Sequence, residues 1–443
     1  MPAEKLPGRP TFRPCEVSSW PHPDVVTCVI LATVTNYRGV GWTRTYETHW
    51  ESCMKTALSP DEVAFRDELR SFYRTEIPSD IRERAKYGRE LSRDDIVTTH
   101  KILNDNGLAV PNWPVEWGGK DWTPMQRHIW QDEMQLASVP EPLTFNAQMV
   151  GPVIAHFGSP ELKQRFLPPT AALDIWWCQG FSEPDAGSDL ASLRTTAVRD
   201  GDSYIVNGQK IWTTMAQYAD WIFCLVRTDP NAPKKQAGIS FLLFDVKSPG
   251  VTIRPIKLID GGYEVNEVFF ENVRVPADQL VGQENMGWTY AKFLLGNERT
   301  GITGVGRTKV KIGVAKEYAA QVKSGSGTLL ADPVFAARVA ELENELLALE
   351  LTQLRVISDS ADGKPNPASS VLKLRGSELQ QAATELLLDI AGPDALPVGA
   401  DEIASPAWAQ RSGPGYLNYR KTTIYGGSSE VQRTIIASTI LGL

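Results

Sequence analysis

The sequence predicts an α+β fold in which a small β-barrel-like domain lies between a helical N-terminal domain and a C-terminal helical bundle. Three observations support this order. Apolar stripes with a helical period occupy residues 59–170, strand-like runs replace them between about 175 and 283, and long helical stretches return after Gly287-Trp288. The expected domains are therefore N-terminal helical at 54–174, β at 175–285 and C-terminal helical at 286–443.

The first helix has a clear start signal. Ser59-Pro60-Asp61-Glu62 combines an N-cap residue, a proline at the first helical position and acids in the first turn. Residues 1–53 show no sustained period of 2 or 3.6 and are rich in proline and tryptophan. We expect them to be a poorly ordered extension or to precede a true translation start at Met54, which N-terminal sequencing of the native protein would decide.

The later elements follow from residue type and spacing. Runs of β-branched and aromatic residues predict strands at 203–206, 221–226 and 239–244. Asn207-Gly208 predicts a hairpin turn ahead of Trp212. Long apolar stripes predict C-terminal helices at 333–359 and 370–390, with a Gly- and Pro-containing loop at 362–367 between them.

Composition excludes several functional classes. The net charge of −8 and pI near 5.4 disfavour a nucleic-acid partner, because phosphate binding needs clustered Lys and Arg. The five cysteines lack CxxC pairs and metal-ligand spacing, so we expect no disulfide framework, no metal and a reducing cytoplasm. The apolar run at 25–34 is shorter than the roughly 20 residues that a membrane helix needs, so no membrane association is expected.

Two segments concentrate groups that suit a planar ligand. Residues 178–190 gather small, hydroxyl and carboxylate side chains in one loop, whose backbone amides can approach a ligand closely. Ile211-Trp212-Thr213-Thr214 places an indole beside two hydroxyls, an arrangement that suits a heteroaromatic cofactor. Taken alone, such segments are more often an ordinary turn and a core tryptophan.

Further strings decide between these interpretations. With residues 207–210, 268–276 and 424–430, the two segments closely resemble the acyl-CoA dehydrogenase family, in the family's order, from about Ser59 to Leu443. The resemblance implies FAD between the β domain and the C-terminal helices, with an acyl-CoA chain between the flavin and a carboxylate base. That base takes the α proton while flavin N5 takes the β hydride, leaving a trans-2-enoyl-CoA. It also implies an oxidoreductase of lipid degradation that passes electrons to an electron-transfer flavoprotein.

The resemblance assigns site residues motif by motif. The implied cofactor-binding residues are Gln179, Phe181, Ser182, Gly187, Ser188, Trp212, Thr213, Thr214, Ser428 and Glu430. Ser188 would also contact the substrate at its coenzyme A end.

The catalytic base requires a choice between two places. Many family members carry a glutamate where this chain has Gly426, whose backbone N–H can still polarise the thioester carbonyl. Other members carry the glutamate in a Glu-Arg string on a helix after the β domain, which here is Glu298-Arg299. A lone helical glutamate is usually a surface residue. Because position 426 lacks a carboxylate, Glu298 is the expected base, and Arg299 the expected support for the substrate.

Other departures concern the subunit interface. The family's Arg-x-x-Phe-Gly string, through which a neighbouring subunit grips FAD, is replaced by residues 318–327, where Lys323 is at most a partial substitute. The common Gly-Gly turn is replaced by residues 388–395. This pattern resembles the branch that contains pimeloyl-CoA dehydrogenase large subunits and steroid side-chain dehydrogenases. We expect a homo-oligomer or a heteromer with a homologous subunit.

Some alternatives stay open. An acyl-CoA oxidase would use the same flavin and base, although such enzymes are usually longer. A non-catalytic partner subunit would keep the fold for assembly, and nitroalkane oxidation is permitted on the same fold. The glycines in 301–306 either make room for a bulky or dicarboxylic acyl group or ease helix packing.

Overall fold

The computed structural model describes residues 58–359, 366–396 and 405–443, with side chains throughout these ranges except at 296–302 and 359. The predictions for residues 1–53 therefore lie outside the described residues. Among the described residues, no helix is long and apolar enough to cross a membrane.

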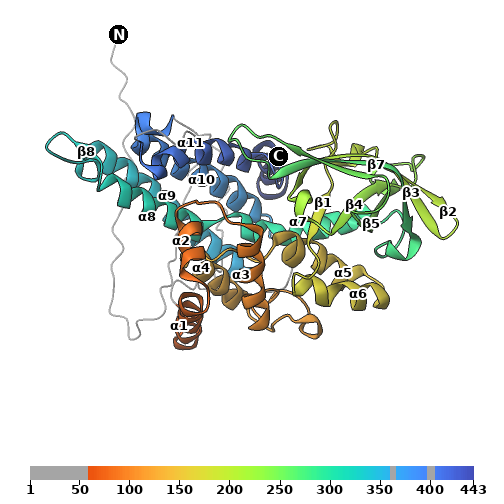
Figure 1. Ribbon diagram of the computed structural model, residues 1–443. Helices are drawn as coiled ribbons and strands as arrows, with labels where there is room; N and C mark the ends of the chain where they lie inside the picture. The colour runs from red at the N-terminus through yellow and green to blue at the C-terminus, as the bar shows by residue number, and fades with distance from the viewer. Residues whose placement is uncertain (1–57, 360–365, 397–404) are drawn as a thin grey trace, which may run out of the picture. The chain divides into compact units, whose positions relative to one another are not determined.

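The N-terminal region is helical, as predicted (Figure 1). Its α-helices are α1 (Pro60–Thr75), α2 (Ser79–Lys86), α3 (Arg93–Asp105), α4 (Pro124–Leu136), α5 (Gly151–Phe157) and α6 (Pro160–Ala171). The predicted start of α1 is confirmed, since the Ser59 hydroxyl accepts from the Glu62 amide and the Glu62 carboxylate accepts from the Ser59 amide. The same reciprocal cap opens α3 and α4.

A curled seven-stranded sheet follows, as the strand-like runs predict. Its strands are β1 (Trp177–Gly180), β2 (Thr196–Asp200), β3 (Ser203–Thr214), β4 (Trp221–Arg227), β5 (Ile239–Asp245), β6 (Val251–Ile256) and β7 (Val265–Pro276). Their order is β1-β4-β2-β3-β7-β6, with β5 on the other side of β4. The centre of β4, residues 222–226, is buried on both faces, which explains its unbroken apolar sequence.

The predicted hairpin turn at Asn207-Gly208 is wrong. These residues lie inside β3, where the register against β7 shifts between Val206 and Gly208. The Asn207 side chain donates to the Asn272 side chain and accepts from the Asn272 amide, at 3.2 and 2.8 Å. The side chain of Asn207 thus stabilises a β-bulge within a continuous strand. The Asn-Gly pair forms this bulge and does not reverse the direction of the chain.

The C-terminal region returns to helices, as predicted (Figure 1). They are α7 (Gly287–Ile302), α8 (Val305–Ala319), α9 (Pro333–Asp359), α10 (Ser369–Ala391), α11 (Ala407–Tyr419) and α12 (Ser429–Ile436). The helix α10 contacts α7, α8, α9, α11 and α12, so it organises this bundle. Gly304 separates α7 from α8, and its φ of 62° lies in the left-handed region.

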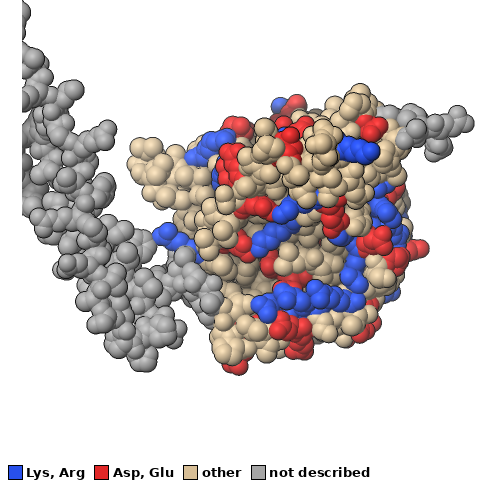
Figure 2. Space-filling model, turned by 90° about the vertical axis from the view of Figure 1, so that its left-hand side faces the viewer, with Lys and Arg blue, Asp and Glu red and all other residues tan. Residues whose placement is uncertain are grey.

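The apolar core joins these regions. One buried cluster includes residues of α1, α3 and α4, one face of the sheet and α7, among them Trp130, Trp177, Phe241 and Leu294. The other face of the sheet has its own cluster, and α8, α9 and α10 share a third. On the surface, acidic and basic side chains are interspersed over the face that Figure 2 shows.

Candidate functional site

The two predicted cofactor segments lie side by side. The amide of Ile211 donates to the carbonyl of Ser182 at 2.9 Å. The ammonium of Lys210 donates to the carbonyl of Phe181 at 3.1 Å and to the Glu183 carboxylate at 2.7 Å. These hydrogen bonds therefore hold the loop after β1 against β3, immediately before Trp212.

The Lys210–Glu183 pair is buried, with side-chain exposures of 0% and 7%. Burial alone would raise the pKa of Glu183, but Lys210 and the amides of Arg194 and Thr195 together hold this pKa below its usual value. The carboxylate therefore stays charged. Through its hydrogen bonds it joins the loop after β1 to Lys210 on β3 and to the amides of Arg194 and Thr195.

The residues after Lys210 present groups that suit a planar ring system. The register of β3 against β7 shifts again between Lys210 and Thr213. Trp212 adopts a φ of 60° at this irregularity and keeps 56% of its surface exposed. The Thr213 hydroxyl oxygen is buried without a hydrogen-bond partner among the described residues. An exposed indole beside an unpartnered hydroxyl fits a heteroaromatic cofactor such as a flavin.

The late string forms a glycine turn. Gly426 and Gly427 have φ values of 64° and 86°, which a glutamate at 426 would adopt only at a steric cost. Their carbonyls accept from the Gln432 side chain at 3.4 and 3.2 Å. Within the described part of the chain, the Gly426 amide donates no hydrogen bond, so this N–H is available to a ligand oxygen.

Contacts link this turn region to the sheet. The Asn418 side chain donates to the carboxylates of Asp260 and Glu264, in the segment between β6 and β7. Lys421 forms an ion pair with Glu264. These contacts connect the C-terminal helices to the strand that pairs with Thr213 and Thr214.

The remaining predicted cofactor residues differ in exposure. Gln179 and Ser182 are half-buried, while Gly187, Ser188 and Glu430 are exposed. Phe181 is buried, with its ring edge-on to Phe223 and Phe241 at centroid distances of 5.8 and 6.1 Å. Ser428 accepts from the Val431 amide and so caps α12. The side chains of Glu298 and Arg299, on α7, lie outside those described.

Sequence reasoning missed the Lys210–Glu183 pair. The available signal was a lysine inside a strand, in Gln209-Lys210-Ile211, because a lysine at an inward strand position needs a buried partner.

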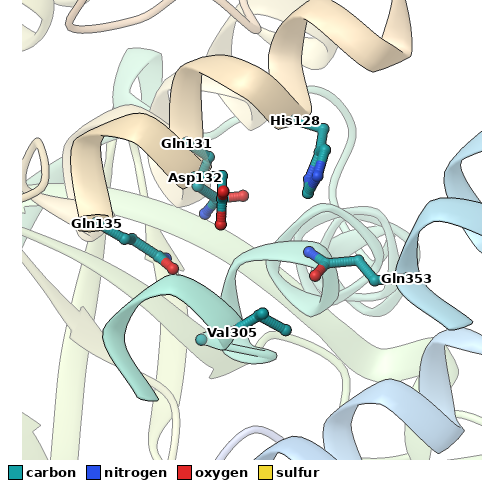
Figure 3. Close-up of a pocket in the computed structure, with 7 residues that line it drawn as sticks. His128, Gln131, Asp132, Gln135, Val305 and Gln353 are labelled. Carbon is teal, nitrogen blue, oxygen red and sulfur yellow. The ribbon is translucent and has the colours of Figure 1, made fainter. Parts of the chain in front are cut away.

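The glycines beside α7 serve packing where the structure describes them. A Cβ on Gly306 would lie 2.8 Å from Gln135 Cβ, so this glycine lets α8 approach α4. Gly304 makes the break between helices. A cavity of about 10 Å³, roughly one water molecule in size, lies at this contact. Figure 3 shows His128, Asp132 and Gln353 pointing toward it.

The replaced interface string forms a short hairpin. Strands β8 (Lys323–Ser324) and β9 (Gly327–Thr328) pair around Gly325, which has a φ of 57°. Lys323 is exposed. Its charge is therefore accessible from outside the chain.

Comparison with known proteins agrees with this arrangement. Models of the acyl-CoA dehydrogenase N-terminal, middle and C-terminal domains match residues 59–174, 178–273 and 285–441. Acyl-CoA dehydrogenase IpdE1 of Mycobacterium tuberculosis is 38% identical over 339 residues, which are 76% of this chain and 85% of IpdE1. The chain belongs to the acyl-CoA dehydrogenase family.

The solved structures that resemble this acyl-CoA dehydrogenase include members from two-chain complexes, one of them titled a steroid ACAD. A chain of the ChsE4-ChsE5 complex from Mycobacterium tuberculosis is 33% identical, with a TM-score of 0.75 over 88% of this chain and 99% of that one. A chain of the Tcur3481-Tcur3483 steroid ACAD is 28% identical, with a TM-score of 0.76 over 87% and 98%. The predicted family, branch and α-β-α architecture are confirmed, and the chain is an oxidoreductase of a flavoprotein family.

Proposed function

We propose that the protein oxidises an acyl-CoA thioester to the trans-2-enoyl-CoA, with FAD as its cofactor. The observation that carries this proposal is the set of hydrogen bonds between the loop 181–183 and residues Lys210 and Ile211. These hydrogen bonds align the two cofactor segments. We also propose functional domains at 54–174, 175–285 and 286–443.

The FAD site would combine residues of three segments. These are Gln179, Phe181, Ser182, Gly187 and Ser188 after β1, Trp212, Thr213 and Thr214 on β3, and Ser428 and Glu430 at α12. The unpartnered Thr213 hydroxyl and the exposed Trp212 indole support this assignment. When bound, FAD supplies the acceptor for the hydride that leaves the β carbon.

The chain's own residues would activate the α carbon. Glu298 takes the α proton as general base, and Arg299 supports the substrate. The Gly426 amide donates to the thioester carbonyl and stabilises the negative charge that develops there. The described residues offer this amide no other hydrogen-bond acceptor, which supports the role. Ser188 contacts the substrate toward coenzyme A.

Replacing the base tests the proposal. Glu298→Gln should keep its flavin but lose nearly all turnover, because the amide cannot accept the α proton. Glu271→Gln, at an exposed position on β7, is the matched control and should keep full turnover. Visible absorbance during anaerobic addition of a panel of acyl-CoA thioesters reports both loading and reduction. Substantial bleaching of Glu298→Gln would exclude Glu298 as the base.

We further propose that a homologous subunit completes the FAD site. The ChsE4-ChsE5 and Tcur3481-Tcur3483 structures each pair two chains, and the family's interface arginine and phenylalanine are replaced here by the β8–β9 hairpin. Expressed alone, the chain should be colourless or poorly loaded, and co-expression with a homologous subunit should restore flavin. A fully yellow homotetramer in size-exclusion chromatography would refute the heteromer. An electron-transfer flavoprotein is the proposed acceptor, and the cytoplasm the proposed location.

A further inference from the structure

One buried side chain holds the glycine turn at 426–427. Gln432 lies in the first turn of α12 and is 1% exposed. Its side-chain nitrogen donates to the Gly427 carbonyl at 3.2 Å and to the Gly426 carbonyl at 3.4 Å. Because a side-chain amide has two N–H donors, Gln432 directs both of them to this turn.

The backbone of this turn needs such support. Gly426 and Gly427 both have a left-handed φ, and glycine has more backbone freedom than any other residue. If the turn were free to rotate, the Gly426 N–H would change direction with it. A Cβ on Gly427 would lie 2.5 Å from the Gln432 side-chain nitrogen, so this glycine also makes room for the contact. Gln432 therefore limits the orientations that the turn can adopt.

The chain before the turn is held by α10. The ammonium of Lys373, a fully buried residue of α10, donates to the Thr422 carbonyl at 3.0 Å. The Tyr425 amide then donates to the Lys421 carbonyl at 3.1 Å. The Gly426 amide therefore lies between a segment that α10 holds and the two carbonyls that the glutamine of α12 holds.

The hydrogen bonds of Gln432 determine which way its amide faces. Turning the amide over would place its oxygen against the two carbonyl oxygens, which would repel it. The nitrogen therefore faces the turn, and the oxygen is buried without a hydrogen-bond partner among the described residues. An apolar side chain of the same shape would remove this unsatisfied acceptor together with the donors, so the stability of the fold should change little.

We propose that Gln432 is a positioning residue, which holds the glycine turn so that the Gly426 N–H meets the thioester carbonyl. This inference rests on the proposed function, in which that amide stabilises the negative charge developing on the carbonyl oxygen. A hydrogen-bond donor stabilises such charge most when its position is fixed before the reaction. Since this chain has glycine where many family members have glutamate, its backbone is freer there and depends more on a side-chain support.

Replacing the glutamine tests the proposal on the flavin-loaded enzyme, with its partner subunit if one is required. Gln432→Met keeps the size of the side chain but donates no hydrogen bond. Its kcat should fall about 10- to 100-fold, as expected when an oxyanion donor is misplaced. The dissociation constant of the acyl-CoA should change little, because the carbonyl gains its charge mainly in the transition state. Flavin content and thermal midpoint should stay close to those of the wild type.

Infrared spectroscopy separates positioning from a general structural role. A hydrogen bond to a carbonyl weakens the C=O bond and lowers its stretching frequency. The product, trans-2-enoyl-CoA, isotope-labelled at the carbonyl carbon, therefore reports the Gly426 hydrogen bond without turnover. In Gln432→Met the labelled band of the bound product should lie at a higher frequency than in the wild type.

Matched variants serve as controls. Gln353→Met changes another buried glutamine with an unpartnered oxygen, in α9 beside the cavity of Figure 3, and should leave kcat and the band unchanged. Gly427→Ala should act like Gln432→Met, because its methyl group displaces the Gln432 amide. Gly201→Ala is its control, since Gly201 has a φ of 61° but nothing within 4 Å of an added Cβ.

The outcomes distinguish this inference from the proposed function. A wild-type kcat and an unshifted band in Gln432→Met would overturn the inference alone, and so would a loss of flavin in place of a loss of kcat. If Gln432→Met does not fold, the same readouts in Gly427→Ala, compared with Gly201→Ala, decide. Flavin-loaded wild-type enzyme that oxidises no acyl-CoA thioester would overturn the proposed function as well.

Discussion

Lys210 and Glu183 form a buried ion pair, 2.7 Å between ammonium and carboxylate, at the point where the loop after β1 meets β3. The same ammonium also donates to the Phe181 carbonyl. This ion pair therefore contributes both to the packing of the sheet and to the alignment of the two predicted cofactor segments.

Breaking the Lys210–Glu183 ion pair should lower both the free energy of unfolding and the amount of bound flavin. Lys210→Met leaves the Glu183 charge buried without its partner, which should destabilise the fold by about 3–5 kcal/mol. The double variant Lys210→Met/Glu183→Gln should recover much of that stability. Lys247→Met, which removes an exposed pair with Asp220, should cost at most about 1 kcal/mol. Thermal unfolding and the ratio of flavin to protein absorbance measure these effects.

Removing the unpartnered hydroxyl of Thr213 should affect the cofactor more than the fold. Thr213→Val keeps the shape of the side chain, so thermal stability should stay nearly unchanged, while the flavin dissociation constant should rise about 2- to 10-fold. Thr99→Val is the matched control, because Thr99 in α3 also buries a hydroxyl without a described partner. Equal flavin affinity in the two variants would contradict a role for Thr213.

Asp132 makes stability depend on pH. Burial raises its pKa from 3.8 to about 6, so the fold favours the neutral acid. The resulting stabilisation is present below the unfolded pKa of about 4 and is lost as pH rises through about 6. Asp132→Asn should therefore exceed wild type at pH 7 by up to about 3 kcal/mol, with little difference below pH 4. Thermal midpoints across this range test the sign, with the exposed Asp121→Asn as control; a flat difference would contradict it.

A substitution at Gly187 tests whether a ligand comes close to the loop after β1. A Cβ there meets nothing within 4 Å, and the residue does not have a left-handed φ. Gly187→Ala should therefore fold normally yet bind flavin or acyl-CoA less tightly, since only the ligand would meet the added methyl group. Gly313→Ala, inside α8 with equally open space, should keep both affinities. Unchanged binding in Gly187→Ala would place the ligand elsewhere.

Local signals in the sequence were sufficient for much of the fold. The Ser59 cap, the strand at 221–226 and the long helices need only neighbouring residues for their prediction, and they form as expected. The role of Lys210 could not be predicted in this way, because its partner is 27 residues away and meets it only through strand pairing. Asn207-Gly208 misled for the same reason, since its partner Asn272 is 65 residues distant. The candidate site depends on such distant pairings, so family resemblance was needed to assemble it.

The contacts of Asn418 with Asp260 and Glu264 carry a consequence for biosynthesis. Asp260 and Glu264 precede Asn418 by 158 and 154 residues in the sequence. During translation, the segment between β6 and β7 must wait for more than 150 further residues before its polar groups meet their partners. Domains fold in the order in which they leave the ribosome. The earlier helices and the sheet can therefore form early, whereas the proposed ligand-binding surface between the sheet and the last helices is assembled at the end of synthesis. Nascent chains that stop before residue 418 should therefore fold in part and bind no cofactor.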